Sequence, residues 1–184
     1  YTGDKTKPEN KYFAGFIDGF SEALRCSVHV HHVNPFEAWR SFARKTVDST
    51  ILIEDIDRSV AGFTTLATKS VNTTVTIRRV RNLYRSFIYW GDMASGMTGF
   101  LYDGHNITYG SFGQLLLLSN DTTVTISNLR DVSLGSFFGM GSGARRSNIT
   151  IRDIVDVKTS AFFSPVVTTQ SPTLLITNVS DVSN

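Results

Sequence analysis

The segment Thr122-Thr-Val-Thr-Ile-Ser-Asn-Leu129 decides the fold, because variants of it recur along the chain. Its pattern is a polar residue, any residue, an aliphatic residue, any residue, Ile, any residue, Asp or Asn, and an aliphatic residue. Close copies begin at Ser49, Thr73, Ser147 and Pro172, and weaker copies begin at Cys26 and Thr98. The seven starting positions, 26, 49, 73, 98, 122, 147 and 172, lie 23 to 25 residues apart.

Two further series of residues follow the same period. A small residue precedes a phenylalanine once per unit, at Phe16, Phe42, Phe63, Phe87, Phe112, Phe137 and Phe162. An Asp or Asn recurs near the end of the apolar pattern, at Asp57, Asn82, Asn106, Asp131, Asp156 and Asp181. Three series with one period indicate a tandem repeat fold.

The alternation inside each unit predicts a strand with one buried face. Val75 and Ile77 are expected to point inward, and Thr74 and Thr76 to point outward. The Asp or Asn that follows tolerates a left-handed backbone and is expected to end the strand in a turn. When such units stack at a spacing of about 4.8 Å, each strand pairs with its copies above and below.

The sequence therefore predicts an all-β protein, a right-handed parallel β-helix (β-solenoid) of about seven coils of 23–25 residues. Residues 1–25 are expected to form a partial first coil or an N-terminal cap, and residues 26–184 the repeats. The unit that starts at residue 172 matches the consensus and does not resemble a cap, although solenoids normally end in atypical capping repeats. We therefore expect a fragment of a longer array, or an open end that stacks on a neighbouring subunit.

The aliphatic-x-Ile-x-Asx-aliphatic unit resembles the right-handed parallel β-helix superfamily typified by pectate lyases and by many tailspike and surface proteins. The resemblance covers about 160 residues and implies the fold, and the right-handed sense rests on it and on the unit length. The repeats rich in Val, Ile and Thr are also similar to the dispersed-gene-family surface proteins of trypanosomes. Leucine-rich repeats and propeller blades require a different frame or a longer unit.

Composition excludes several classes of protein. The net charge of +2 gives no reason to expect a nucleic-acid partner, since nucleic-acid binders usually carry a strong one-sided basic field. The single cysteine, Cys26, allows no intrachain disulfide. The run Leu115–Leu118 is far shorter than a membrane span, so no membrane insertion is expected. The chain begins at Tyr1 rather than Met, which indicates a processed chain or a piece of a longer one.

Two chemical readings of the acidic residues remain open. Asp131, Asp156 and Asp181 would stack on successive coils, where Ca²⁺ could relieve their repulsion. We favour exposed turn residues screened by water and salt, and we predict no cofactor. The resemblance to pectin-cleaving proteins implies carboxylate pairs, but their Asn-Thr-Asp, Asp-Asp, Gly-His-Gly and Arg-Ile-Lys motifs are missing. Asp103-Gly-His105 is the nearest tripeptide, and the chain is not expected to be an enzyme.

Histidines and aromatic residues supply the remaining candidates. His29 and His31 are expected to point outward from one strand, where they could bind a metal adventitiously, but no acidic or Cys ligand is suggested beside them. An outward row of aromatics with nearby acids would favour sugar binding, whereas scattered or inward aromatics would favour a structural role. Phe100 and Tyr102 are predicted to point inward. The other candidate aromatics are Trp39, Tyr84, Tyr89, Trp90 and Tyr109.

Five Asn-x-Ser/Thr sequons exceed the number that chance predicts and are candidate glycosylation sites. They begin at Asn72, Asn106, Asn120, Asn148 and Asn178. We therefore expect an extracellular or cell-surface glycoprotein segment with a structural or adhesive role, which binds itself, a glycan or a surface protein. The alternative is a polysaccharide-binding or polysaccharide-cleaving β-helix.

Overall fold

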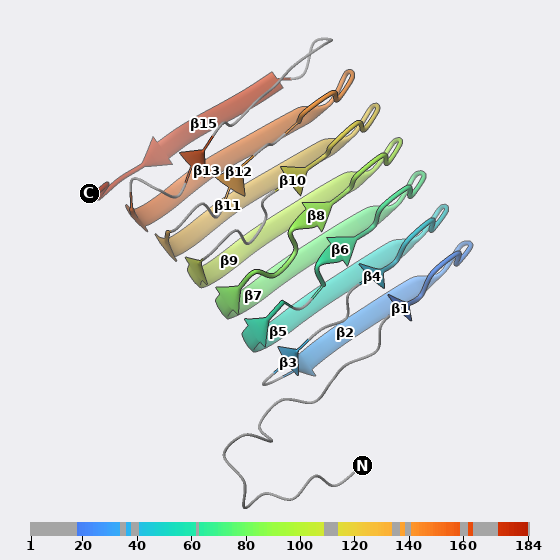
Figure 1. The fold of residues 1–184 in the computed structure, drawn as a ribbon, viewed down its shortest axis with the longest axis horizontal. Coiled ribbons are helices and arrows are strands. Elements are labelled where there is room, and N and C mark those ends of the chain that lie inside the picture. Colours follow the sequence, from blue (N-terminus) through green and yellow to red (C-terminus); the bar gives the residue numbers. More distant parts are fainter. Residues whose placement is uncertain are drawn as a thin grey trace, which may run out of the picture.

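The computed structural model describes residues 18–33, 36–37, 41–61, 63–108, 114–133, 137–138, 141–158, 162–163 and 173–183. In these residues all regular structure is β-strand (Figure 1). Seven long strands form one parallel sheet in the order β15-β13-β11-β9-β7-β5-β2. Their bounds are β2 Ser27–Val33, β5 Thr50–Val60, β7 Thr74–Tyr84, β9 Thr98–Thr108, β11 Thr123–Val132, β13 Asn148–Val157 and β15 Thr173–Val179.

Short strands of two residues form the second face of the solenoid. A five-stranded sheet has the order β1-β4-β6-β8-β10, and β12 pairs with β14. The short strand β3 belongs instead to the sheet of long strands, where it pairs with β5. Their bounds are β1 Asp18–Gly19, β3 Phe36–Glu37, β4 Ser41–Phe42, β6 Thr65–Leu66, β8 Tyr89–Trp90, β10 Gln114–Leu115, β12 Phe137–Phe138 and β14 Phe162–Phe163.

The prediction of an all-β parallel solenoid is confirmed, with a small difference in the number of coils. The stack makes about five turns rather than the seven predicted. Seven long strands do pair in series, but the described short strands form a continuous sheet only from β1 to β10. Residues 1–17, which belong to the predicted first coil or cap, lie outside the described residues.

The register of the long strands stacks inward residues on inward residues, which produces the dry core. Val124 pairs with Ile149 on one side and with Gly99 on the other. Val75 and Ile77 are fully buried, while Thr74 and Thr76 lie half-buried on the outer face, as predicted. Burial of these aliphatic columns is the main source of stability, because each buried aliphatic side chain contributes roughly 1.5–3 kcal/mol.

The coil that contains β9 corrects the predicted frame by one residue. Thr98 pairs with Thr74, so the unit begins at residue 97 and its inward residues are Gly99 and Leu101. Phe100 consequently points outward and is 38% exposed, and Tyr102 lies half-buried beside it on the same face. The prediction that both aromatics point inward is wrong, because a shift of one residue exchanges the two faces of a strand.

Each long strand bends where a residue adopts a left-handed backbone. In β5 these residues are Asp55 and Arg58, with φ of 55° and 57°. Pairing continues on both sides of each bend, so the predicted turns lie within one long strand instead of ending it. Asp57 pairs with Arg81, which puts Arg58, and not Asp57, in the position of Asn82. The assignment of Asp57 to the Asp/Asn series is therefore wrong by one residue.

The phenylalanine series is also not a single column. Phe42 pairs with Leu66, whereas Phe63 lies in the bend that precedes that strand. The rings nevertheless form one cluster inside the core: Phe42 meets Phe63 edge to face with centroids 5.2 Å apart, and Phe63 stacks on Phe87 with centroids 5.1 Å apart. Phe137 and Phe162 pair as the period predicts. Phe16 and Phe112 lie outside the described residues.

The first polar residue of the repeat has a structural role that explains its identity. Ser49, Thr73, Thr122 and Ser147 are buried, and each hydroxyl donates to the carbonyl oxygen two residues earlier at 2.7 to 3.0 Å. These bonds satisfy backbone acceptors in the tight turn that leads into each long strand. A hydroxyl serves this role in four coils, whereas Cys26 and Met97 occupy the same position in two others.

Candidate functional site

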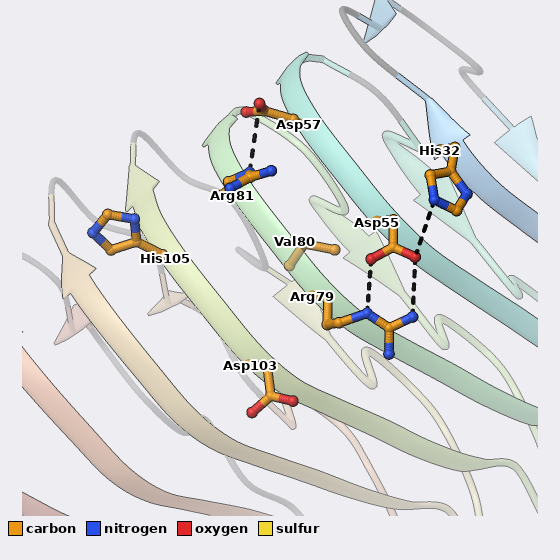
Figure 2. Close-up of a pocket in the computed structure, with 8 residues that line it drawn as sticks. All are labelled: His32, Asp55, Asp57, Arg79, Val80, Arg81, Asp103 and His105. Atoms are coloured by element: carbon orange, nitrogen blue, oxygen red, sulfur yellow. Dashed lines mark hydrogen bonds and ion pairs between the residues drawn. The ribbon is translucent and has the colours of Figure 1, made fainter.

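A groove crosses the sheet of long strands where β5, β7 and β9 make their first bend (Figure 2). It encloses about 660 Å³, and we call it the charged groove. Its lining side chains are His32, Asp55, Asp57, Arg79, Val80, Arg81, Asp103 and His105. Asp55, Arg79 and Asp103 occupy equivalent left-handed positions on three successive coils, which aligns them across the strands.

Charge alternates between the coils that form this groove. The strand β5 contributes Glu54, Asp55 and Asp57, and β7 contributes arginines at the facing positions. The register pairs Glu54 with Arg78 and Asp57 with Arg81. Opposite charges therefore meet across adjacent parallel strands, an arrangement that stabilises this register and opposes alternatives.

Glu54 is the centre of the ion pairs beside the groove. Its Oε2 accepts hydrogen bonds from Arg78 Nε at 2.5 Å and Arg79 Nη2 at 2.6 Å. Its Oε1 lies 2.7 Å from His29 Nε2. The Arg78 hydrogen bond, opposed by partial burial and supported by His29, lowers the pKa of Glu54 to about 2. Glu54 is consequently an anion at neutral pH.

Asp55 and Arg79 form a two-bond pair inside the charged groove (Figure 2). Arg79 Nε donates to Asp55 Oδ1 at 2.7 Å, and Nη2 donates to Oδ2 at 3.0 Å. The Arg79 hydrogen bonds lower the pKa of Asp55, and Asp55 raises the pKa of Arg79. Arg81 Nε lies 3.5 Å from Asp57 Oδ2. Each of these two aspartates of the groove wall therefore lies next to an arginine of the adjacent strand.

The histidines face acidic residues that the sequence did not associate with them. His29 and His31 point outward and Val28 and Val30 are buried, as predicted. Besides the contact of His29 with Glu54, His32 Nε2 lies 3.9 Å from Asp55 Oδ2. His105 Nε2 contacts Asp131 Oδ2 of the next coil. These partners lie about 25 residues apart, and only the register brings them together.

A second groove, of about 470 Å³, follows the far ends of the long strands. We call it the acidic groove, because Asp131, Asp156 and Asp181 line it with Lys158 as the one lysine or arginine. Among the described residues, no group of three or more His, Cys, Asp and Glu side chains is arranged to hold a metal ion. The prediction of solvated turn aspartates without a cofactor stays a prediction, and Ca²⁺ binding stays its less favoured alternative.

The five sequons lie in two regions of the solenoid. Asn72 and Asn120 belong to the turns before the long strands, and Asn148 begins β13. Asn106 and Asn178 lie at bends within long strands, with φ of 53° and 51°. All are exposed except Asn120, which is half-buried. The Nδ2 atoms of Asn72, Asn106 and Asn178 donate hydrogen bonds to the preceding coil, to Asp48, Asn82 and Asp153.

The aromatic side chains form no continuous outer row in the described residues. Trp90 is fully buried, and Tyr84 and Tyr89 are about one-third exposed on different strands. Phe100 and Tyr102 lie together on the outer face of β9. Tyr102 Oη accepts a hydrogen bond from Arg78 Nη1 at 3.3 Å. Trp39 and Tyr109 lie outside the described residues.

Two carboxyl groups at the charged groove are held as anions by neighbouring arginines. Glycoside hydrolysis requires one carboxylic acid with a raised pKa opposite a second carboxylate. The pKa values of Glu54 and Asp55 are both lowered by arginines. In the described part of the chain, the carboxyl with a raised pKa is Asp92, which is buried in a turn outside the groove. The groove is therefore suited to binding polar groups.

The fold defines this chain as a parallel β-solenoid protein. Comparison with known protein families, curated proteins and solved structures found no match. None of the described residues forms a helix of the length and hydrophobicity that a bilayer crossing requires.

Proposed function

We propose that this chain is a structural or adhesive segment of an extracellular, cell-surface repeat protein. The observation that carries the proposal is the unbroken parallel sheet of seven long strands in one register. Such a stack behaves as a stiff rod, because each coil pairs with its neighbours along its whole length. Its lateral surface offers repeated polar positions for contact with a glycan or a surface protein, and no catalytic role is proposed.

The exposed face of β15 supports stacking on a further coil. Ile176 occupies the position of the buried Ile151 and is nevertheless 39% exposed. In the described residues β15 pairs with β13 alone. A further coil, from a longer parent chain or from a second subunit, would bury these apolar groups and pair the free strand edge.

Electron microscopy with intact-mass analysis of the native material tests this proposal. We expect rods or fibres whose length exceeds that of this segment, with excess mass at the sequons Asn72, Asn106, Asn120, Asn148 or Asn178. A discrete, unglycosylated particle with its own end caps would contradict it.

Polysaccharide binding is the second candidate, because Phe100 and Tyr102 point outward beside the charges of Arg78 and Glu54. Aromatic rings that flank charged groups suit stacking on sugar rings. Binding of the chain to a panel of neutral and acidic polysaccharides tests it, with Phe100→Ala as the variant. The outer-face substitution Leu52→Ala, on the same column two coils away, is the matched control. Equal binding by both variants would exclude a role for the aromatic pair.

The family relationship is proposed on the same grounds. The parallel solenoid is compatible with the pectate-lyase-like superfamily and with the dispersed-gene-family surface proteins of trypanosomes. We propose the former relation from the repeat unit and the latter from its Val-, Ile- and Thr-rich composition. A crystal structure of the chain tests the former relation, because a left-handed coil would contradict it.

A further inference from the structure

Six tight turns that lead into long strands line one edge of the solenoid (Figure 1). Backbone hydrogen bonds connect them from coil to coil, for example Lys69 N to Asp92 O at 2.7 Å and Met93 N to Leu117 O at 2.7 Å. We call this edge the turn ridge, and it comprises residues 20–25, 43–48, 67–72, 91–96, 116–121 and 141–146.

The turn ridge carries unbalanced positive charge. Its exposed acids are each paired: Glu22 with Lys45 at 2.6 Å, and Asp121 with Arg146 at 2.6 Å. Asp48 lies 4.0 Å from Arg25. Three exposed cations have no ion pair within the described residues, and they are Arg44, Lys69 and Arg145.

Apolar side chains project from the same ridge. Leu24 is 63% exposed, Met93 is 45% exposed and Leu118 is 54% exposed. Met93 and Leu118 occupy equivalent positions on adjacent coils, so they form a continuous apolar contact surface flanked by Lys69. Exposed apolar groups beside unpaired cations are typical of a surface that meets an acidic partner.

The acidic groove lies at the opposite ends of the long strands. Of its three aspartates, Asp156 and Asp181 form no ion pair in the described part of the chain. Tyr84 gives one end of this groove an apolar wall and is 36% exposed. The groove and the turn ridge both run along the stacking axis, and both repeat with the spacing of one coil.

We propose that copies of this solenoid associate side by side, with the turn ridge of one copy in the acidic groove of the next. The partner is a second copy because the two surfaces share one repeat distance, so that Arg44 and Lys69, on adjacent coils, can face Asp156 and Asp181, which also lie on adjacent coils. The surfaces lie on opposite edges, so the contact is heterologous and produces an open lateral array. This inference goes beyond the end-to-end stacking proposed above.

Sedimentation of the unglycosylated chain at low and high salt is the test. At about 0.01 M salt, where the Debye length is roughly 30 Å, we expect association that increases with concentration. At about 1 M salt, where it is roughly 3 Å, we expect monomers. The variant Arg44→Glu/Lys69→Glu reverses the ridge, and Asp156→Lys/Asp181→Lys reverses the groove. Each variant alone is expected to lose association at low salt.

Mixing the two variants gives the decisive result. The reversed ridge of one then fits the reversed groove of the other, while their unchanged surfaces remain complementary, so association should return. Lysine is tolerated at left-handed positions in this chain, as Lys45 and Lys69 show with φ of 56° and 57°. Arg152→Glu reverses one charge on the outer face of β13, outside both surfaces, and this control should associate like the unaltered chain. Circular dichroism confirms that each variant folds.

Three outcomes would overturn the proposal. They are a monomer at low salt, association that survives both charge reversals, and failure of the mixture to associate. Binding to vesicles that contain anionic lipid, without self-association, would assign the ridge to a membrane surface instead. The contact also requires Asn72, Asn106 and Asn120 to be free of glycan, because they lie on the ridge or line the groove, and occupancy there would exclude it.

Discussion

Trp90 and Gly99 fill one space in the core that two medium-sized residues fill in other coils. A Cβ at Gly99 would lie 2.8 Å from Trp90 Cζ2 and 2.9 Å from Val124 Cγ2. The neighbouring coil has Leu66 in the position of Trp90 and Val75 in the position of Gly99. The large and small residues of this coil are therefore complementary in volume, as close packing requires.

Gly99→Val alone should destabilise the protein by about 1–3 kcal/mol, because the added side chain overlaps Trp90. Trp90→Leu alone should also destabilise it, because it leaves a cavity. The double variant reproduces the Leu66 and Val75 pair and should recover most of the loss. Urea unfolding of all four proteins measures this coupling. Additive losses in the double variant would show that the two residues do not share the space.

Asp92 is a buried carboxyl group with an unpaired oxygen. It is 7% exposed, its Oδ1 has no hydrogen-bond partner, and the same is true of Thr68 Oγ1 on the preceding coil. Burial raises the pKa of Asp92 to about 6, although a hydrogen bond with the Leu117 backbone opposes the shift. Between about pH 4 and pH 6 the Asp92 carboxyl is therefore mostly protonated in the native state. In the unfolded chain, where its pKa is lower, it is mostly ionised over the same range.

Stability should consequently fall as pH rises from about 4 to about 7, by an amount on the order of 2 kcal/mol from this group. Asp92→Asn should remove this part of the pH dependence, because an amide does not ionise. Unfolding free energies of both proteins at the two pH values check the prediction. Asp48→Asn, in a turn at the exposed surface, is the control. An unchanged slope in Asp92→Asn would contradict the assignment.

The pairing of β5 with β7 combines backbone hydrogen bonds with a set of ion pairs. Glu54 contacts both Arg78 and Arg79, and its pKa of about 2 lies below its ordinary value. A lowered pKa means that the stabilisation is present above about pH 4.5 and is lost as pH falls towards 2. Like charges directly opposite each other would instead destabilise the pair of strands.

Glu54→Gln should lower the urea midpoint at neutral pH and have a much smaller effect near pH 2, where the unaltered glutamate is itself protonated. Salt should reduce the effect at neutral pH. Glu22→Gln, which removes an exposed pair with Lys45, should change the midpoint little. A pH-independent loss in Glu54→Gln would indicate lost packing rather than lost charge pairing.

The solenoid as a whole should tolerate removal of one complete coil. Residues 123 and 148 are register partners, so deletion of 123–147 joins equivalent positions. We expect a protein that folds cooperatively with a smaller urea m-value, because each coil contacts mainly its neighbours. Deletion of 123–146 leaves one extra residue in the tight turn before the next strand and should lower the stability, because either the turn bulges or the inward residues of that strand turn to the solvent. Equal stability of both deletions would contradict the register.

Periodicity predicted the fold because a solenoid is a local structure repeated. The strands that begin at Thr50, Thr74 and Thr123 pair as their matching patterns require. The frame failed at Thr98, because Gly99 and Gly104 replace the aliphatic residues that mark the inward face. The signal that identifies the correct frame is Asp103, which lies as far after Thr98 as Asn128 lies after Thr123 in the next coil.

The candidate site could be predicted only in part. The acidic run at Glu54 and the basic run at Arg78 were visible in the sequence, but their contact depends on the exact offset of 24 residues between paired strands. The contact between His29 and Glu54 also depends on the register, because the two side chains belong to adjacent coils. The frame of the repeat also determined which face each aromatic residue was predicted to occupy. The one-residue error at Thr98 therefore reversed the predicted orientations of Phe100 and Tyr102.

The sequence by itself determined the repeat length, the strands and their inward residues, because alternation and period follow directly from the geometry of a pleated strand. The tertiary structure decided which charges pair, which aromatics face the solvent, and how the two edges of the molecule differ in charge. These features depend on the register between coils, which is set by the summed packing of all the columns. No single segment determines that packing. The small residue at Gly99, for example, is explained only by the adjacent side chain of Trp90.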